Sequence, residues 1–274
     1  MAIKDILVHL DHTDRSDRRL EVALNLAKTH GAKLTAFYAR ANVNVQGLSG
    51  RGEDVYLKRI QEKEAEFDAK VAGAGVNVEW KPATYSMSDT AVTDQIIDHA
   101  LHADLTIVGQ HDVENADGSI PSDLAARLVL ESGRPLLIIP HSGKIATLGE
   151  RVMIAWNAGR ESARAVNDAI PVLQKAKNVQ ILALNPDDGD KHHGEIPCAD
   201  ICQHLSEHGI EAKPQHLTAH DIDTGNMLLS CLAEEASDLL VMGAYGQHRF
   251  RELVLGGATR DILRNMTVPV LMSH

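Results

Sequence analysis

The chain repeats one pattern, and this repeat limits the folds open to it more than any other feature. An apolar run that starts with aspartate and ends in glycine, 104–109, recurs at 238–243. The apolar runs that begin with Pro135 and Pro269 are also 134 positions apart. Two copies of one unit in a chain of 274 residues indicate two domains of one fold.

Each copy alternates apolar runs with segments of helical periodicity. The first apolar runs are 6–10 and 152–156, and apolar residues at helical spacing follow both of them. Alternating β and α elements predict a parallel sheet that is covered by helices on both faces. We therefore predict an α/β chain of two tandem doubly wound parallel-sheet domains, 1–143 and 150–274.

A glycine pattern follows the last copy of the apolar run. Gly243 is followed by Gly246 and, after nine more residues, by Gly256, which gives the spacing G-x2-G-x9-G. The preceding residues 238–242 are predicted to form a buried strand, and residues 260–264 resemble the start of a helix. Glycines allow close approach of a ligand, and a helix N-terminus attracts anions. The arrangement predicts a phosphate site at the carboxyl end of the strand.

The glycine spacing excludes the two common phosphate loops and resembles a third. The chain has neither G-x-x-x-x-G-K-[ST] nor a dinucleotide fingerprint after a strand. The spacing, the run 252–256 and the closing apolar run 268–272 are similar to those of nucleotide-binding universal stress proteins. The resemblance covers essentially the whole chain, as a tandem member with the fold of the adenine nucleotide alpha hydrolases.

The resemblance implies a function and a set of binding residues. It implies that the C-terminal domain binds ATP or a related adenine nucleotide, with or without Mg²⁺, and that the protein acts in stress response as a sensor or regulator. Two positions depart from the family: Asn157 replaces an aspartate, and Gly257 replaces a common serine. Thr259 has an alternative role as a helix N-cap. The implied contacts are Ala155, Asn157, Leu184, Gly243, Gly246, Gly256, Gly257, Ala258 and Thr259.

The first copy lacks the phosphate motif. Gly109 is present, but Asp112 takes the place of the second glycine, and the acidic stretch 113–119 follows. Because carboxylates repel phosphate, we expect one nucleotide per chain and an N-terminal domain that serves as a structural partner or holds a non-anionic ligand. Single-copy relatives pair as dimers, so we expect the two domains to pair through the runs 136–139 and 268–272. The sequence also leaves open whether two whole chains form a homodimer.

Two other constellations offer alternatives. A cluster of imidazoles and thiols suits zinc by ligand type but matches no standard spacing; its members are His192, His193, Cys198, Cys202, His204 and His208. His248 and three arginines, Arg249, Arg251 and Arg260, flank the glycine motif. No carboxylate in the motif is placed to orient water or hold Mg²⁺, so we expect no enzyme or a slow ATPase. A module that binds metal or an apolar ligand is the third class.

Charge and composition exclude several partners. The formal net charge is −11, whereas binding to a phosphate backbone needs a basic face. No apolar run approaches the roughly 20 residues that span a bilayer, and the N-terminus does not resemble a secretory signal. Three cysteines argue against a disulfide framework. We therefore expect a cytoplasmic protein without nucleic-acid or membrane partners.

Overall fold

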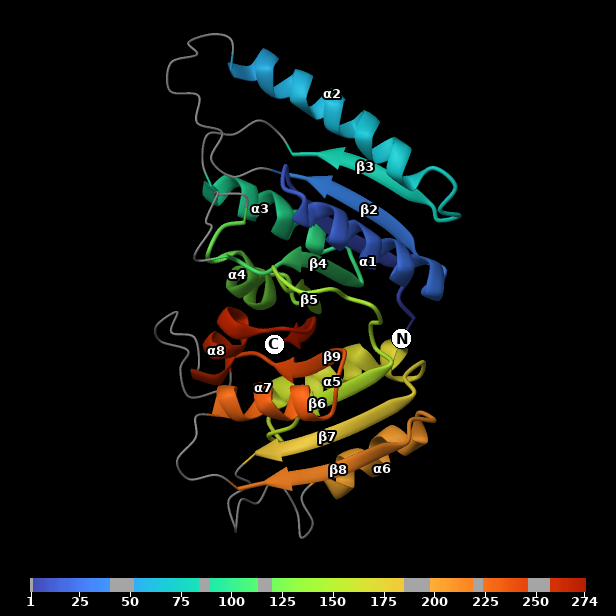
Figure 1. The fold of residues 1–274 in the computed structure, drawn as a ribbon, viewed down its shortest axis with the longest axis vertical. Coiled ribbons are helices and arrows are strands. Elements are labelled where there is room, and N and C mark those ends of the chain that lie inside the picture. Colours follow the sequence, from blue (N-terminus) through green and yellow to red (C-terminus); the bar gives the residue numbers. More distant parts are fainter. Residues whose placement is uncertain are drawn as a thin grey trace. The chain divides into compact units, whose positions relative to one another are not determined.

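The structure of the protein is a computed structural model that describes residues 2–39, 52–83, 89–112, 120–184, 198–218, 224–245 and 257–274. Its contacts divide the chain into an N-terminal unit, Ala2–Arg134, and a C-terminal unit, Pro135–His274. Figure 1 shows strands alternating with helices in both units. Among the described residues, no helix has the length and apolar character that a membrane crossing requires.

The N-terminal unit is built on four parallel strands in the order β3-β2-β1-β4. Because β4 lies on the other side of β1 from β2, right-handed connections place α1 and α2 on one face and α3 on the other. Its elements are β1 (Asp5–Leu10), α1 (Arg15–His30), β2 (Lys33–Tyr38), α2 (Gly52–Val71), β3 (Val78–Pro82), α3 (Asp89–Ala100), β4 (Leu105–Gly109) and α4 (Leu124–Glu131).

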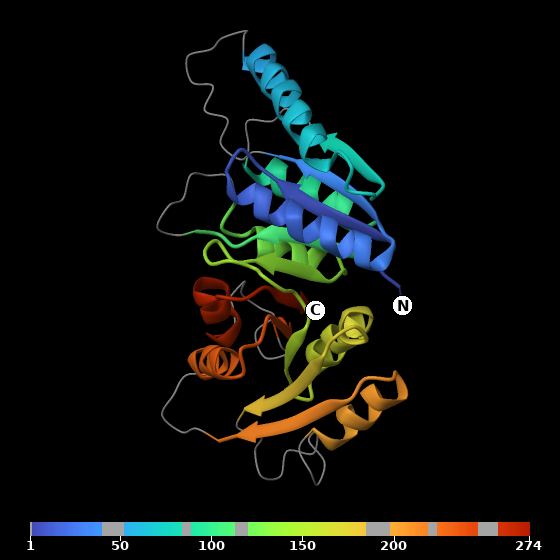
Figure 2. The ribbon, with the colours of Figure 1, turned by 45° about the vertical axis from the view of Figure 1, so that its right-hand side comes forward.

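The C-terminal unit repeats this order and adds two strands at one edge, giving β5-β10-β9-β6-β7-β8. Its elements are β5 (Leu136–Ile139), β6 (Arg151–Ala155), α5 (Arg160–Leu173), β7 (Asn178–Leu184), α6 (Ala199–Glu207), β8 (Ala212–Leu217), α7 (Thr224–Glu234), β9 (Leu239–Gly243), α8 (Gly257–Asn265) and β10 (Val270–Ser273). Figures 1 and 2 both show α2 beside β3 and α6 beside β8, so each copy carries its second helix in the same place.

The inner strands of both units are buried on both faces, as parallel strands covered by helices must be, whereas the edge strands β3 and β8 are partly exposed. In the C-terminal unit, Val152, Ile154 and Leu240 are at most 1% exposed. The core is aliphatic, because only 3% of the residues are aromatic. The predicted fold class, two tandem doubly wound α/β domains with mostly parallel sheets, is therefore confirmed.

The aspartate that begins each repeated strand has the same structural role in both copies. The carboxylate of Asp104 accepts hydrogen bonds from the backbone N–H groups of Lys4 (2.7 Å) and Asp5 (3.1 Å), where β1 begins. Asp238 likewise accepts hydrogen bonds from Glu150 and Arg151, at 3.1 and 2.9 Å, where β6 begins. The repeat therefore preserves a link between the first strand and its neighbour in the sheet.

The strand β5 pairs with β10, as we expected for these two runs. The pairing is antiparallel and sets Val270 opposite Ile138 and Met272 opposite Leu136. This pairing is the reason why the contacts assign the chain from Pro135 onward to the C-terminal unit. The domain boundaries 1–143 and 150–274 stay a prediction. The boundary that the contacts give lies between Arg134 and Pro135, ahead of the predicted end of the first domain.

Candidate functional site

A cavity of about 180 Å³ lies at the carboxyl ends of β6, β7 and β9. The strand order reverses here, because β7 and β9 lie on opposite sides of β6, and such switch points are where ligands bind in open α/β sheets. The structure brings six of the nine residues implied by the glycine motif to its wall: Ala155, Asn157, Leu184, Gly243, Ala258 and Thr259.

Of the other three implied residues, Gly257 alone is described, and it is not among the residues of the cavity wall. Gly257 is the first residue of α8, next to two residues that do line it. Gly246 and Gly256 lie outside the described residues, as do His248, Arg249 and Arg251. Arg260 lies on α8, with its Nε 4.0 Å from a carboxylate oxygen of Asp261.

Gly243 is required by the close packing of α5 on β9. A Cβ atom at this position would lie 2.5 Å from the carbonyl carbon of Glu161 and 2.5 Å from the backbone nitrogen of Ser162. Real Cβ atoms do not approach backbone atoms so closely, and the helix start cannot move without leaving the sheet. The glycine that the sequence assigns to a phosphate loop therefore also positions the first turn of α5 over the cavity.

Asn157 forms the turn that leads into α5. Its Oδ1 accepts a hydrogen bond from the backbone N–H of Gly159 at 3.0 Å. The equivalent residue of the N-terminal unit, Asp11, accepts one from the backbone N–H of Thr13 at 2.8 Å. Side chains of this kind stabilise turns before helices. The substitution of asparagine for aspartate thus keeps the turn and removes a negative charge beside the cavity.

Thr259 lies in the first turn of α8 and is 6% exposed. The alternative role as a helix N-cap is wrong, because an N-cap precedes the helix and Thr259 is its third residue. The position leaves Thr259 on the cavity wall beside Ala258, at the helix end where the macrodipole favours an anion.

The cavity wall also contains polar residues that sequence reasoning missed, above all Glu161 and Tyr245. Glu161 is only 3% exposed. Among the described residues, neither its Oε1 nor the hydroxyl of Tyr245 has a hydrogen-bond partner. Burial raises the pKa of Tyr245 to about 12. The remaining wall residues are Trp156, Ser162, Leu182, Thr224, Leu228 and Met242.

Comparison with protein-family models identifies the chain. Residues 2–140 and 199–274 match the model described as the universal stress protein family. The chain belongs to the universal stress protein family. Both matched segments carry the repeated strands, so the family assignment agrees with the tandem arrangement predicted from the repeat.

Other comparisons place this universal stress protein among relatives. One from Synechocystis sp. is 50% identical over 38 residues, which span 14% of this chain and 13% of that protein. The crystal structure of a universal stress protein from Archaeoglobus fulgidus DSM 4304 is 18% identical, with a TM-score of 0.77, and the match covers 98% of this chain and 97% of that one. A universal stress protein in complex with cAMP is 22% identical, with a TM-score of 0.37 and coverages of 52% and 100%.

The corresponding region of the N-terminal unit is filled by two internal ion pairs. The guanidinium of Arg19 packs against Gly109, and its Nη1 lies 2.5 Å from the place that a Cβ atom on this glycine would take. Its Nη2 donates to the buried carboxylate of Asp11 at 2.5 Å. Arg15 Nη2 donates to Asp112 at 2.7 Å. Our expectation that Asp112 acts by repelling phosphate is corrected, because its charge is paired with Arg15. The acidic stretch 113–119 lies outside the described residues.

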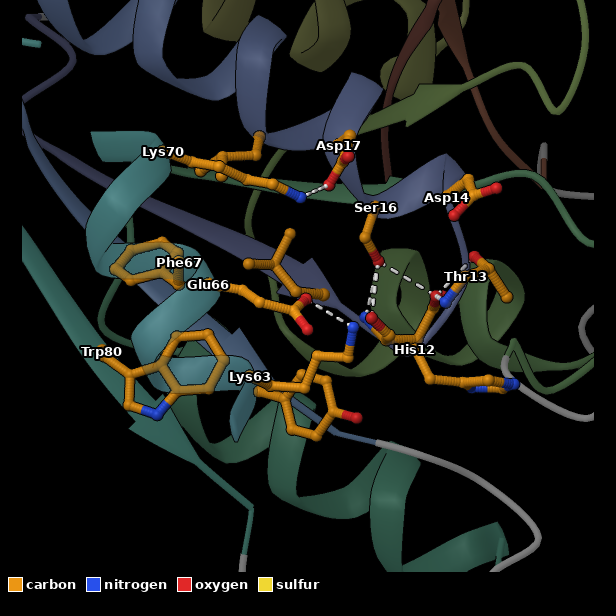
Figure 3. Close-up of a pocket in the computed structure, with 14 residues that line it drawn as sticks. His12, Thr13, Asp14, Ser16, Asp17, Lys63, Glu66, Phe67, Lys70 and Trp80 are labelled. Carbon is orange, nitrogen blue, oxygen red and sulfur yellow. Dashed lines mark hydrogen bonds and ion pairs between the residues drawn. The ribbon is translucent and has the colours of Figure 1, made fainter. Parts of the chain in front are cut away.

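A smaller pocket of the N-terminal unit, of about 90 Å³, lies between α1 and α2 and reaches Asp11, just after β1 (Figure 3). Figure 3 shows two lysines at this pocket, and both are engaged in ion pairs. Lys63 Nζ lies 2.6 Å from Glu66 Oε2, and Lys70 pairs with Asp17. Their charges are compensated, so this wall offers no excess positive charge to a phosphate.

His9 is buried beside the Asp11–Arg19 pair and gives the N-terminal unit a pH dependence. Its Nε2 hydrogen-bonds the carbonyl oxygen of Ala39 at 3.0 Å. Burial and then the charge of Arg19 lower the pKa of His9 to about 4. Burial opposes ionisation of Asp11 too, but the charge of Arg19, together with His9 and the hydrogen bonds from Thr13, outweighs it and holds the pKa of this carboxyl well below its ordinary value.

We expect the unfolding free energy of the N-terminal unit to fall between pH 7 and pH 5. The unfolded chain protonates His9 near pH 6.5, whereas the folded chain does so near pH 4. The stabilisation is therefore complete above pH 6.5 and is lost as the pH falls towards 4, with about 2 kcal/mol lost by pH 5. Urea unfolding at both pH values should show this loss in the wild type and little of it in His9→Gln, which keeps a donor for Ala39.

The histidine and cysteine cluster does not assemble a metal site in the described part of the chain. No three potential ligands lie together there, and His192 and His193 fall outside it. Burial raises the pKa of Cys198 to about 11 and also raises that of Cys202. Since metals bind the thiolate, this environment does not favour metal binding by these two cysteines.

Proposed function

We propose that this universal stress protein binds ATP or a related adenine nucleotide in its C-terminal unit and acts in stress response as a sensor or regulator. One observation carries the proposal: six of the residues implied by the glycine motif meet on the wall of one cavity, at the switch point of the sheet. In this proposal, nucleotide occupancy changes the surface of the protein.

The described residues fit the two ends of a nucleotide. Ala155, Leu182 and Leu184 offer an apolar wall at the ends of β6 and β7, which suits a base. Ala258 and Thr259 lie in the first turn of α8, where unsatisfied backbone N–H groups and the helix dipole favour phosphate. A bound Mg²⁺ would neutralise part of the phosphate charge, and water and phosphate oxygens would supply most of its ligands.

The proposal also covers the location and the partners of the protein, but it includes no catalytic activity. We include in the proposal a cytoplasmic location and no nucleic-acid partner, which the net charge of −11 and the low cysteine count support. The proposal leaves open whether two whole chains form a homodimer. A slow ATPase is the alternative, and Mg²⁺-dependent phosphate release by the purified protein above the uncatalysed rate would favour it.

Gly257→Ser tests the phosphate end of the site. Among the described atoms, none lies within 4 Å of a Cβ placed on Gly257, so serine at this position displaces none of them. We expect ATP affinity to stay equal or to rise by up to about a hundredfold, because a hydrogen bond to a charged group contributes roughly 1.5–3 kcal/mol. Calorimetric titration with ATP and with adenosine measures the effect. An equal change for both ligands would show that residue 257 does not face phosphate.

A further inference from the structure

The carboxylate of Glu161 is held inside the wall of the C-terminal cavity. Its side chain is 4% exposed, and it is the second residue of α5. The first turn of this helix packs directly on Gly243, where the Cβ of Glu161 would lie 2.8 Å from an added Cβ. Because this contact fixes the start of the helix, the charged group cannot leave the cavity by a movement of the backbone.

Among the described residues, nothing donates a hydrogen bond to the buried Oε1 of this carboxylate. Arg160 Nη2 lies 3.2 Å from Oε1, but the pair does not have hydrogen-bond geometry, and the arginine side chain is 60% exposed. Such an exposed partner is screened by water and contributes little. A buried carboxylate accepts hydrogen bonds and donates none when ionised, and leaving it without donors is costly. A ligand that fits this cavity must therefore bring donors to Glu161.

The position of Glu161 above the strand ends determines which part of a bound nucleotide lies next to it. Leu184 ends β7 on one side, and Ala258 begins the α8 wall on the other, while Glu161 lies over the end of β9 between them. With the base at β7 and the phosphates at α8, the ribose falls at the centre. Its vicinal hydroxyls are two adjacent donors, and a carboxylate receives such donors in dinucleotide-binding folds.

We propose that Glu161 accepts hydrogen bonds from the ribose 2′- and 3′-hydroxyls and makes the cavity selective for ribonucleotides. The proposal rests on the proposed function, nucleotide binding in the C-terminal unit. The N-terminal unit has the opposite chemistry at this position, because its equivalent residue is Arg15, which is paired with Asp112. Ribose selection is therefore a property of the second copy alone.

The test is a titration of the full-length protein with ATP, 2′-deoxy-ATP and inosine triphosphate, for the wild type and for Glu161→Gln. We expect the wild type to prefer ATP over 2′-deoxy-ATP by at least tenfold and the variant to reduce this preference to less than threefold. Glu234→Gln, which changes an exposed glutamate of α7, is the matched control and should keep the wild-type preference. Thermal unfolding of each variant shows that the unit is folded.

Three outcomes would overturn the proposal, and they differ in what they leave standing. If Glu161→Gln strengthens the binding of ATP and 2′-deoxy-ATP by the same factor, the carboxylate acts only by repelling phosphate. If the variant removes a preference for ATP over inosine triphosphate, Glu161 contacts the base amine. In both cases nucleotide binding itself stands. If the wild type binds none of the three nucleotides, the proposed function fails together with the inference.

Discussion

Gly243→Ala is expected to destabilise the C-terminal unit by about 3 kcal/mol, since overpacking of a tight contact costs 1–3 kcal/mol or more, and to abolish nucleotide binding. The added methyl group would lie 2.5 Å from two backbone atoms, the carbonyl carbon of Glu161 and the nitrogen of Ser162. Backbone atoms cannot rotate away as a side chain does, so the start of α5 must separate from β9. That displacement moves the wall of the cavity.

The two tryptophans allow the effect to be measured in one unit. Trp156 lines the C-terminal cavity, and Trp80 lies in the N-terminal unit. Denaturant unfolding followed by fluorescence in a Trp80→Phe background therefore reports on the C-terminal unit alone. Gly109→Ala, measured in a Trp156→Phe background, is the comparison, because the described atoms nearest to its Cβ would be side-chain atoms of Arg19 and Ile120 and not backbone atoms. If Gly109→Ala lowers the free energy of unfolding as much as Gly243→Ala or more, the contact of Gly243 with the backbone of α5 does not explain the loss of stability.

Arg19→Met is expected to destabilise the N-terminal unit by about 3–5 kcal/mol, the cost of leaving a buried charge without its partner. The side chains of Arg19 and Asp11 are 1% and 0% exposed, so water cannot replace the lost guanidinium. Methionine keeps most of the apolar volume of the arginine stem, which separates the loss of charge from the loss of packing. Urea unfolding in the Trp156→Phe background measures the change.

The double variant Asp11→Asn/Arg19→Met separates the ion pair from the fold around it. Asparagine retains the turn, as Asn157 does in the second copy, and no buried charge is left over. We expect the double variant to lose less than half of the stability that Arg19→Met loses. A double variant as unstable as the single one, or less stable, would show that Arg19 acts by packing or through its bond to the carbonyl of His9.

The fold was predictable because its signals are local and repeated. The spacing between 104–109 and 238–243, with apolar runs before and after, predicts parallel strands covered by helices, and the structure has them. The placement of Ala155, Leu184 and Thr259 on one wall could also be anticipated, since residues that follow strands of a parallel sheet meet at one edge.

Glu161 and Arg19 could not be assigned in the same way. A charged residue in a helix normally faces solvent, and their burial depends on how closely each helix approaches its sheet at a glycine. The one signal in the sequence is their place in the repeat: Glu161 corresponds to Arg15, and Arg19 to Ala165. Such differences between copies mark where the two units diverged in chemistry, but only the packing shows which charges are enclosed.

The most direct test of the central claim, one adenine nucleotide held in the C-terminal cavity, is the calorimetric stoichiometry of ATP binding in the presence of Mg²⁺ for the wild type and for Ala258→Trp. Ala258 lines the cavity in the first turn of α8, and an indole there would fill it. The account predicts one ATP per chain for the wild type and none for a folded Ala258→Trp variant. Two sites per chain, no binding by the wild type, or one site that persists in Ala258→Trp would contradict it.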